Sequence, residues 1–372
     1  MRIVTHWILF LSISIFIFRA HAFPVAKTLE EAKQSLLVLR NPFNGNALGQ
    51  GIAINLIDQP QSPVIAVATV FHLAVYYLVG KEKNQFSFKG KLCDEQHINQ
   101  GYRFQKIDQF GLRTPSSKKF FTAPAVLVIP CNPNNATRIN QLFEDYIALL
   151  NKPVKKVKGL PIITDTIQDL SNFCLSGEDS AVILANISSH TSGLTGLMQS
   201  DPHLEQISAT DQGTFTFVTD LLTRSVKNKN HPMENSLQSF SVSLIPMNSE
   251  NSENSKRTIH LQGAFNIVPG DSGAPLFDQA GKAVAMVSCT LRREAIYDLS
   301  LEQDNCRKED DVQYCSRDPR IKIDESPNFQ RPEIWQLAVP LSNISTLKSD
   351  GLSILKKHYK NIVKELAGPP TP

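Results

Sequence analysis

A serine lies in a glycine-rich setting at residues 270–275, which read Gly-Asp-Ser-Gly-Ala-Pro and continue into an apolar stretch. The glycines allow a tight backbone turn and a close approach to a substrate carbonyl. In such a turn the backbone N–H groups of Gly270 and Ser272 could converge on one point and stabilise a developing oxyanion. The segment therefore predicts a nucleophilic serine at Ser272, if a general base and an orienting acid accompany it.

Two residues have the settings that these roles require. His72 follows an apolar, β-branched run at residues 64–71, which predicts a buried strand that ends at the histidine. Asp179 lies just ahead of a second such run, at residues 181–184. Rigid strands could thus hold a general base and the acid that fixes its tautomer. We predict acyl transfer in which Ser272 is the nucleophile, His72 the general base and Asp179 the orienting acid.

Asp145 is an alternative for the acid, because it also precedes an apolar stretch. Its surroundings have helical spacing over residues 139–150, whereas Asp179 opens a strand. Asp179 is therefore preferred, and Asp145 stays open as the second candidate.

These segments resemble the signature blocks of the chymotrypsin/trypsin-like serine proteases, including the bacterial HtrA-like branch. Residues 270–275 match the family's Gly-Asp-Ser-Gly-Gly-Pro except at Ala274. Residues 69–72, Thr-Val-Phe-His, resemble the family's Thr-Ala-Ala-His, and residues 179–184 resemble its Asp-x-Ala-Leu-Leu. Similarity also extends to three other segments: 47–51, 281–288 and 338–342.

The resemblance implies a mainly β fold of two antiparallel six-stranded barrels, with the active site in the cleft between them. His72 and Asp179 would come from the first barrel and Ser272 from the second, and the substrate would be a protein or peptide. The sequence pattern independently predicts an antiparallel β architecture, because it has many short strands separated by turns and few long helices.

Several features depart from the family's pattern. His72 and Asp179 are 107 residues apart, which predicts an insertion in the first barrel. No Ile-Val-Gly-Gly-like segment follows a basic residue, so Asp271 lacks the new N-terminal partner that is usual in the family and must find another. The chain ends soon after the last predicted strand, which leaves no room for a PDZ domain and disfavours an HtrA-type chaperone-protease.

The resemblance also assigns a substrate pocket. Alignment through the serine puts Asn266 at the base of the primary specificity pocket, and Ser288 and Thr290 on one wall. Asn266 carries no charge, so a preference for Lys or Arg is not supported, and Thr290 should narrow the entrance. We therefore expect a neutral, small-to-medium side chain before the scissile bond.

Sequence regularities divide the chain into five parts: a signal peptide (1–22), an N-terminal helix or propeptide (23–46), a first barrel with an insertion (47–190), a second barrel (191–345), and a C-terminal helix and tail (346–372). Helical spacing occurs in three places: 27–40, 139–150 and 349–366. Between residues 73 and 178 the strand-like runs are short: 86–88, 125–131 and 160–164. The second barrel should contain strands at five places: 213–219, 239–245, 257–263, 283–289 and 335–339.

The first residues have the form of a secretory signal. Arg2 is followed by an apolar run at residues 7–18 and by Ala-His-Ala at residues 20–22, a cleavage site that predicts a secreted or periplasmic protein. Membrane attachment would require that the segment stays uncleaved. The full chain has a net charge of +3, and cleavage leaves 36 basic and 35 acidic residues. This balance gives no electrostatic footprint for nucleic acid.

An even number of cysteines in an exported chain predicts disulfides: Cys93, Cys131, Cys174, Cys289, Cys306 and Cys315. The sequence does not fix their pairing, although Cys306 and Cys315 would close a short loop and are the preferred pair. No Cys/His cluster with metal-ligand spacing occurs, so we expect no metal and no cofactor. The oligomeric state is not indicated.

Two other functions are compatible with parts of this pattern. An α/β-hydrolase needs Gly-x-Ser-x-Gly and the order Ser, Asp, His, whereas Ala274 occupies the fifth position and only His358 follows the serine. The stronger alternative is a catalytically inactive, trypsin-like binding or adhesion module, which Phe71, Ala274 and the long insertion would suit. Labelling by a fluorophosphonate separates this module from the enzyme.

Overall fold

The computed structural model describes most of both predicted barrels. The described residues are 28–55, 64–115, 117, 119–151, 156–157, 160–161, 179–187, 198–199, 214–220, 237–246, 259–262, 267, 270–292, 305–309, 312–316, 334–341 and, near the C-terminus, 353, 357–358, 360–364 and 366. The predicted signal segment and Asn266 lie outside them. Within the described part of the chain, every helix is too short or too polar to cross a bilayer.

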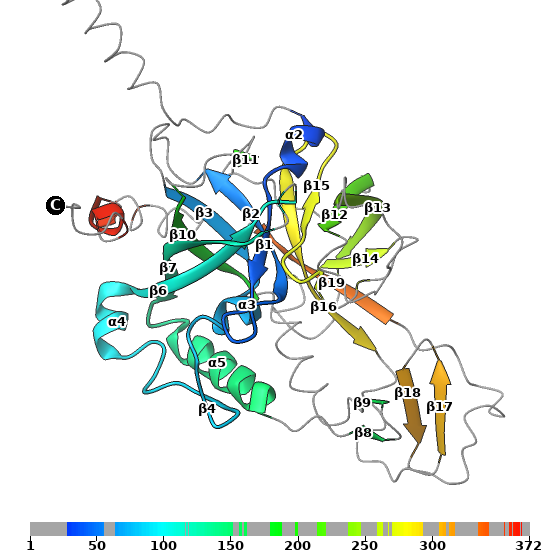
Figure 1. Ribbon diagram of the computed structural model, residues 1–372, viewed down its shortest axis with the longest axis horizontal. Helices are drawn as coiled ribbons and strands as arrows, with labels where there is room; N and C mark the ends of the chain where they lie inside the picture. The colour runs from blue at the N-terminus through cyan, green and yellow to red at the C-terminus, as the bar shows by residue number, and fades with distance from the viewer. Residues whose placement is uncertain are drawn as a thin grey trace, which may run out of the picture.

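Six antiparallel strands form the first barrel: β1 (Leu36–Arg40), β2 (Ala47–Asn55), β3 (Val64–Thr69), β6 (Gly101–Arg113), β7 (Phe121–Cys131) and β10 (Ala181–Asn186). Strand β1 pairs with both β2 and β6 and so closes the ring. A short strand, β11 (Met198–Gln199), adds to β2 in parallel. The first half of the chain is therefore a closed barrel, drawn mainly in blue, cyan and green in Figure 1.

Six more antiparallel strands form the second barrel: β12 (Thr214–Asp220), β13 (Leu237–Pro246), β14 (Ile259–Gln262), β15 (Pro275–Phe277), β16 (Ala283–Arg292) and β19 (Ile334–Pro340). Pairing of β12 with β15 closes this ring. When the strands of each barrel are numbered along the chain, both rings have the order 1-2-3-6-5-4. The two barrels thus share one topology, and they lie side by side (Figure 1).

The apolar runs of the sequence form two neighbouring strands of the first barrel, β3 and β10. Residues 65–68 of β3 and 181–185 of β10 are all buried, as expected for strands covered on both faces. In this antiparallel pair Ala181 lies opposite Thr69. Because the start of one strand faces the end of the other, the register brings His72 and Asp179 to the same end of the barrel.

Two predicted elements differ from the structure. Helical spacing predicts one helix over residues 27–40, but helix α2 covers only Leu29–Lys33 and the rest is β1. Residues 36–39 are fully buried between two neighbouring strands, so tertiary pairing overrides their helical spacing. The first barrel therefore begins before residue 47. Strand β3 ends at Thr69, and His72 lies in a short helix, α3 (Phe71–Val75), rather than at the end of the strand.

The segments between the barrel strands add small elements: the hairpin β4 (Gly80–Glu82) and β5 (Gln85–Ser87), helix α4 (Glu95–Gln100), helix α5 (Ala136–Asn151), and the pair β8 (Lys156–Val157) and β9 (Leu160–Pro161). The hairpin and both helices lie on one side of the first barrel, whereas β8 and β9 lie near β18 (Val312–Ser316) in Figure 1. Helix α5 corresponds to the predicted helix over 139–150. Together with β8 and β9 it occupies the connection from β7 to β10, where the insertion was expected.

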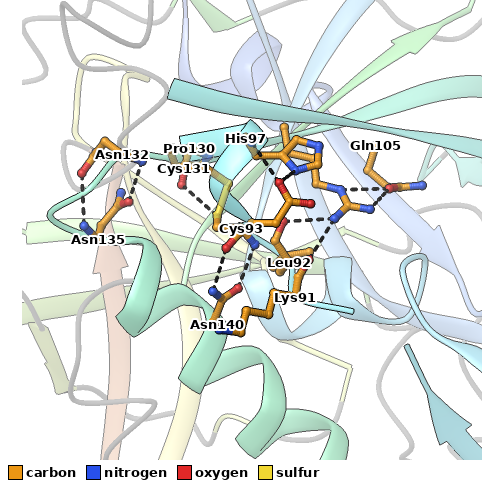
Figure 2. Close-up of a disulfide and its surroundings, with 12 residues drawn as sticks. Lys91, Leu92, Cys93, His97, Gln105, Pro130, Cys131, Asn132, Asn135 and Asn140 are labelled. Atoms are coloured by element: carbon orange, nitrogen blue, oxygen red, sulfur yellow. Dashed lines mark hydrogen bonds and ion pairs between the residues drawn. A yellow bond between two sulfur atoms is a disulfide. The ribbon is translucent and has the colours of Figure 1, made fainter. Parts of the chain in front are cut away.

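Two asparagines anchor α5 to the preceding loop. The Asn140 amide accepts a hydrogen bond from the Cys93 backbone N–H (2.8 Å) and donates one to the Cys93 carbonyl (2.9 Å). Asn151 does the same with the backbone of Phe86, at 2.7 Å in both directions. A disulfide between Cys93 and Cys131 joins this loop to the end of β7 (Figure 2). Helix α5 is therefore held at both ends.

Three further cysteines lie among the described residues, and Cys174 lies outside them. Cys306 and Cys315 lie directly opposite each other in the hairpin of β17 (Asn305–Glu309) and β18 (Val312–Ser316). Cys289 is disulfide-bonded. Near the C-terminus, residues 357–358 and 360–364 are helical, and Ile362 is buried in the same hydrophobic cluster as the strands of the first barrel. The predicted C-terminal helix therefore packs on the first barrel.

Replacing both Cys93 and Cys131 by serine should lower the free energy of unfolding by about 2–4 kcal/mol, because the disulfide closes a loop of 38 residues. Urea unfolding of the two proteins under non-reducing conditions measures the difference. The exposed substitution Ser87→Ala is the control and should leave the midpoint unchanged. Equal midpoints for the wild type and the double serine variant would contradict this role of the disulfide.

Candidate active site

Asp179 binds His72 through both of its carboxylate oxygens. Oδ2 lies 2.8 Å from Nδ1 of the imidazole, and Oδ1 accepts a hydrogen bond of 3.0 Å from the backbone N–H of His72. The Asp179 side chain is fully buried and the His72 side chain is 16% exposed. A carboxylate at Nδ1 favours the tautomer with the proton on that nitrogen, so Nε2 is left as the basic atom.

Ser288 connects the acid to the serine segment. Its hydroxyl donates a short hydrogen bond to Oδ2 of Asp179, and its carbonyl oxygen accepts one from Oγ of Ser272 at 3.4 Å. Asp179 therefore receives hydrogen bonds from the His72 backbone, the His72 ring and the Ser288 hydroxyl. Three donors compensate the removal of this carboxylate from water.

Ser272 lies in a tight turn that requires its glycines. Gly270 and Gly273 have positive φ angles of +104° and +80°. A Cβ atom on Gly273 would lie 1.9 Å from the carbonyl oxygen of Gln50, so no other residue fits there without movement. The Gly273 N–H donates to the Val287 carbonyl at 2.7 Å, which fastens the turn to β16.

Asp271 is bound by Thr219, in place of the N-terminal partner that the sequence lacks. Its side chain is fully buried, and its Oδ1 accepts a hydrogen bond of 2.6 Å from the hydroxyl of Thr219 in β12. Gln50 of β2 supports the same turn: its side-chain amide donates to the Gly270 carbonyl at 2.8 Å, and its backbone N–H donates to the Ser272 carbonyl at 2.8 Å. Both barrels therefore contribute to the support of the serine turn.

An aromatic side chain from the inserted helix covers the histidine. The ring of Tyr146 in α5 lies 6.0 Å from the ring of His72, centroid to centroid, and 6.2 Å from that of Tyr76. Burial raises the pKa of the Tyr146 phenol well above its usual value, and Tyr76 and the charge of Asp179 raise this pKa further. Tyr146 is therefore neutral at all physiological pH values, and its ring lies beside the ring of His72.

The structure brings together three of the predicted site residues, His72, Asp179 and Ser288, and links Ser272 to them through the Ser288 carbonyl. Gly270 lies in the same turn as Ser272 and its carbonyl binds Gln50. Asp145 lies elsewhere: it is on α5, and its carboxylate accepts a hydrogen bond of 2.8 Å from Gln141.

Two predicted pocket residues are less fully described. Asn266 lies outside the described residues, and only the backbone of Thr290 is described, opposite Gln336 of β19. Among the described residues no group of His, Cys, Asp or Glu has an arrangement suited to a metal ion.

Sequence reasoning missed several residues that support the site. It placed Ser288 on the pocket wall, and did not identify its hydroxyl as a partner of Asp179. It also missed Gln50, Thr219 and Tyr146. Burial of a polar residue is the signal that marks Gln50 and Thr219, and it becomes visible only once the strands are paired.

The chain was compared with known proteins. No family profile and no curated protein sequence matches it. Its structure is similar to the MamO protease domain from Magnetospirillum magneticum, with 8% identity, 83% of this chain and 93% of that chain covered, and a TM-score of 0.34. It is also similar to the HtrA-type protease AlgW with a decapeptide (10% identity, 89% and 66% covered, TM-score 0.36) and to an inactive form of the Rv3671c protease (10% identity, 71% and 87% covered, TM-score 0.29).

The strand order of the chain itself defines its fold class. Two closed, six-stranded antiparallel barrels with the same strand order, an insertion in the first barrel and a C-terminal helix make up a mainly β, trypsin-like fold. The predicted fold class is confirmed.

Proposed function

We propose that the chain is a serine endopeptidase that hydrolyses peptide bonds through an acyl-enzyme on Ser272. The observation that supports this proposal most strongly is the arrangement around Asp179. Its carboxylate binds His72 at 2.8 Å and accepts from Ser288, whose carbonyl receives the hydroxyl of Ser272. A buried acid, an imidazole and a serine on a glycine turn are thus linked within one set of contacts.

In the proposed reaction, Oγ of Ser272 attacks the substrate carbonyl carbon while Nε2 of His72 takes the hydroxyl proton. Asp179 holds the Nδ1–H and stabilises the imidazolium that forms. The negative charge that develops on the carbonyl oxygen is bound by the N–H groups of Gly270 and Ser272. His72 then returns the proton to the leaving amine, and a water molecule releases the acid product by the same sequence of steps.

Labelling by a fluorophosphonate tests the nucleophile, because this reagent reacts with an activated serine. The wild-type protein should be labelled, and Ser272→Ala should not. Asp179→Asn should react about 10⁴-fold more slowly, because the amide favours the wrong tautomer of His72. Mass spectrometry of the adduct and the rate of labelling measure these effects.

Ser87→Ala is the matched control, because Ser87 is an exposed serine on the β4–β5 hairpin. This variant should label at the wild-type rate. If the folded, mature wild-type protein is not labelled, the chain is a non-catalytic binding module instead.

The expected substrate preference depends on Asn266, the uncharged residue assigned to the base of the specificity pocket. We expect cleavage after neutral, small-to-medium side chains, and we expect Asn266→Asp to add cleavage after Lys and Arg, because the new carboxylate would pair with the basic side chain. A peptide-library cleavage profile measures both proteins. A wild-type profile dominated by Lys or Arg would refute the assignment of the pocket.

We further propose that residues 1–22 direct export to the periplasm or the medium. The disulfide between Cys93 and Cys131 supports an oxidising compartment. N-terminal sequencing of the protein recovered from expressing cells should begin at Phe23. An intact N-terminus on a membrane-bound product would instead indicate an uncleaved anchor.

A further inference from the structure

The serine turn is held by two buried polar side chains that come from different barrels. Gln50 belongs to β2 of the first barrel and Thr219 to β12 of the second, and both are fully buried. The Gln50 amide nitrogen donates to the Thr219 hydroxyl at 2.8 Å, and this hydroxyl donates to Asp271 at 2.6 Å. A continuous chain of hydrogen bonds therefore crosses from the first barrel to the turn.

The direction of every bond in this chain is fixed. The amide nitrogen of Gln50 carries two hydrogens, which go to the Thr219 hydroxyl and to the Gly270 carbonyl. Its amide oxygen accepts from the backbone N–H of Asp220 at 3.0 Å. Since the Thr219 oxygen receives one hydrogen from Gln50, its own proton goes to the Asp271 carboxylate. Every hydrogen that the Gln50 amide and the Thr219 hydroxyl can donate is therefore used.

A buried ion pair supports the same junction. Arg113 of β6 binds Asp220 of β12 at 2.8 Å, and both side chains are almost completely buried. Asp220 is the residue whose N–H binds Gln50. The first barrel thus contacts the end of β12 through a guanidinium group at Asp220 and through an amide at Thr219 and Asp220.

These contacts orient the two peptide groups that flank Asp271, one of which carries the Ser272 N–H. The Gly270 carbonyl is held by Gln50, the Asp271 carbonyl accepts from the Ala274 N–H at 2.9 Å, and the Ser272 carbonyl accepts from the Gln50 backbone at 2.8 Å. Because a peptide group is planar, fixing the Asp271 carbonyl also fixes the direction of the Ser272 N–H. The hydrogen bond from the Thr219 hydroxyl holds the Asp271 side chain, and so limits rotation of the backbone at Asp271, between the two peptide groups.

We propose that Thr219 and Gln50 are positioning residues for catalysis: they hold Asp271 and the 270–273 turn in the conformation that aims the Gly270 and Ser272 N–H groups at the oxyanion. This inference rests on the proposed protease function. In this proposal the oxyanion site depends on the contact between the two barrels, because Gln50 comes from the first barrel and Thr219 from the second.

The test compares Thr219→Val with Thr219→Ser in the full chain. Valine keeps the shape of threonine and removes the hydroxyl, whereas serine keeps the hydroxyl. Thr219→Val should lower kcat about 100-fold with little change in KM, since a misplaced oxyanion donor acts on the transition state. Thr219→Ser should stay within about threefold of the wild type. Thr214→Val, an exposed position on the same strand, is the matched control.

A second variant reaches the turn from the first barrel. Gln50→Glu is close to isosteric but loses the two donated hydrogen bonds, so it should lower kcat as Thr219→Val does. Thermal unfolding of each variant separates positioning from folding. The expected result is a loss of kcat in proteins that are fully folded at the assay temperature.

Two results would overturn the inference while the proposed function stands: labelled wild type with Thr219→Val and Gln50→Glu at full activity, or losses that occur only in proportion to the unfolded fraction. Equal impairment of Thr219→Ser and Thr219→Val would also exclude the hydroxyl as the cause. If the folded wild type is not labelled by the fluorophosphonate, the proposed function fails and the positioning role falls with it.

Discussion

One buried amide, that of Gln50, limits how the rest of the site can be arranged. It bonds to Thr219, to the backbone of Asp220 and to the carbonyl of Gly270, and its own backbone binds the Ser272 carbonyl. A buried amide that loses its partners destabilises the folded state by about 1–3 kcal/mol for each unsatisfied group. The two barrels and the serine turn must therefore dock in one register, because that register satisfies all of the hydrogen-bonding groups at once.

The repeated topology explains why the site forms between the barrels. In each ring the third strand pairs with the sixth, and in the first barrel this pairing places His72 after β3 and Asp179 before β10 at the same end. The second barrel contributes the connection into its fourth strand, where the glycine turn carries Ser272, and the fifth strand, where Ser288 reaches Asp179. Helix α5, held by Asn140 and Asn151, then covers the histidine with Tyr146.

The sequence predicts correctly those elements whose conformation is determined by neighbouring residues along the chain. The strands rich in β-branched residues, helix α5 and the glycine turn were found because burial and backbone conformation leave a short-range pattern. Strand β6 was missed because a register shift between Ile107 and Phe110 breaks the alternation of buried and exposed residues. Over strand β1 the sequence predicts helix, because its four consecutive buried residues, three leucines and a valine, show no alternation of apolar and polar types. Its conformation is set by β2 and β6, which its own residues do not reveal.

The partners of the site could not be predicted for a related reason. Thr219 and Asp271 are 52 residues apart, and Gln50 and Thr219 are 169 apart, so no spacing rule connects them. A hydroxyl and an amide at these positions are suited to a junction between barrels. The two side chains are uncharged and their bonds are directional, so they fix the orientation of the turn and supply a hydrogen bond to the buried Asp271 carboxylate. Opening of the junction would remove the partners of the serine turn even while each barrel stays folded, so the docking of the barrels governs the geometry of the proposed oxyanion site.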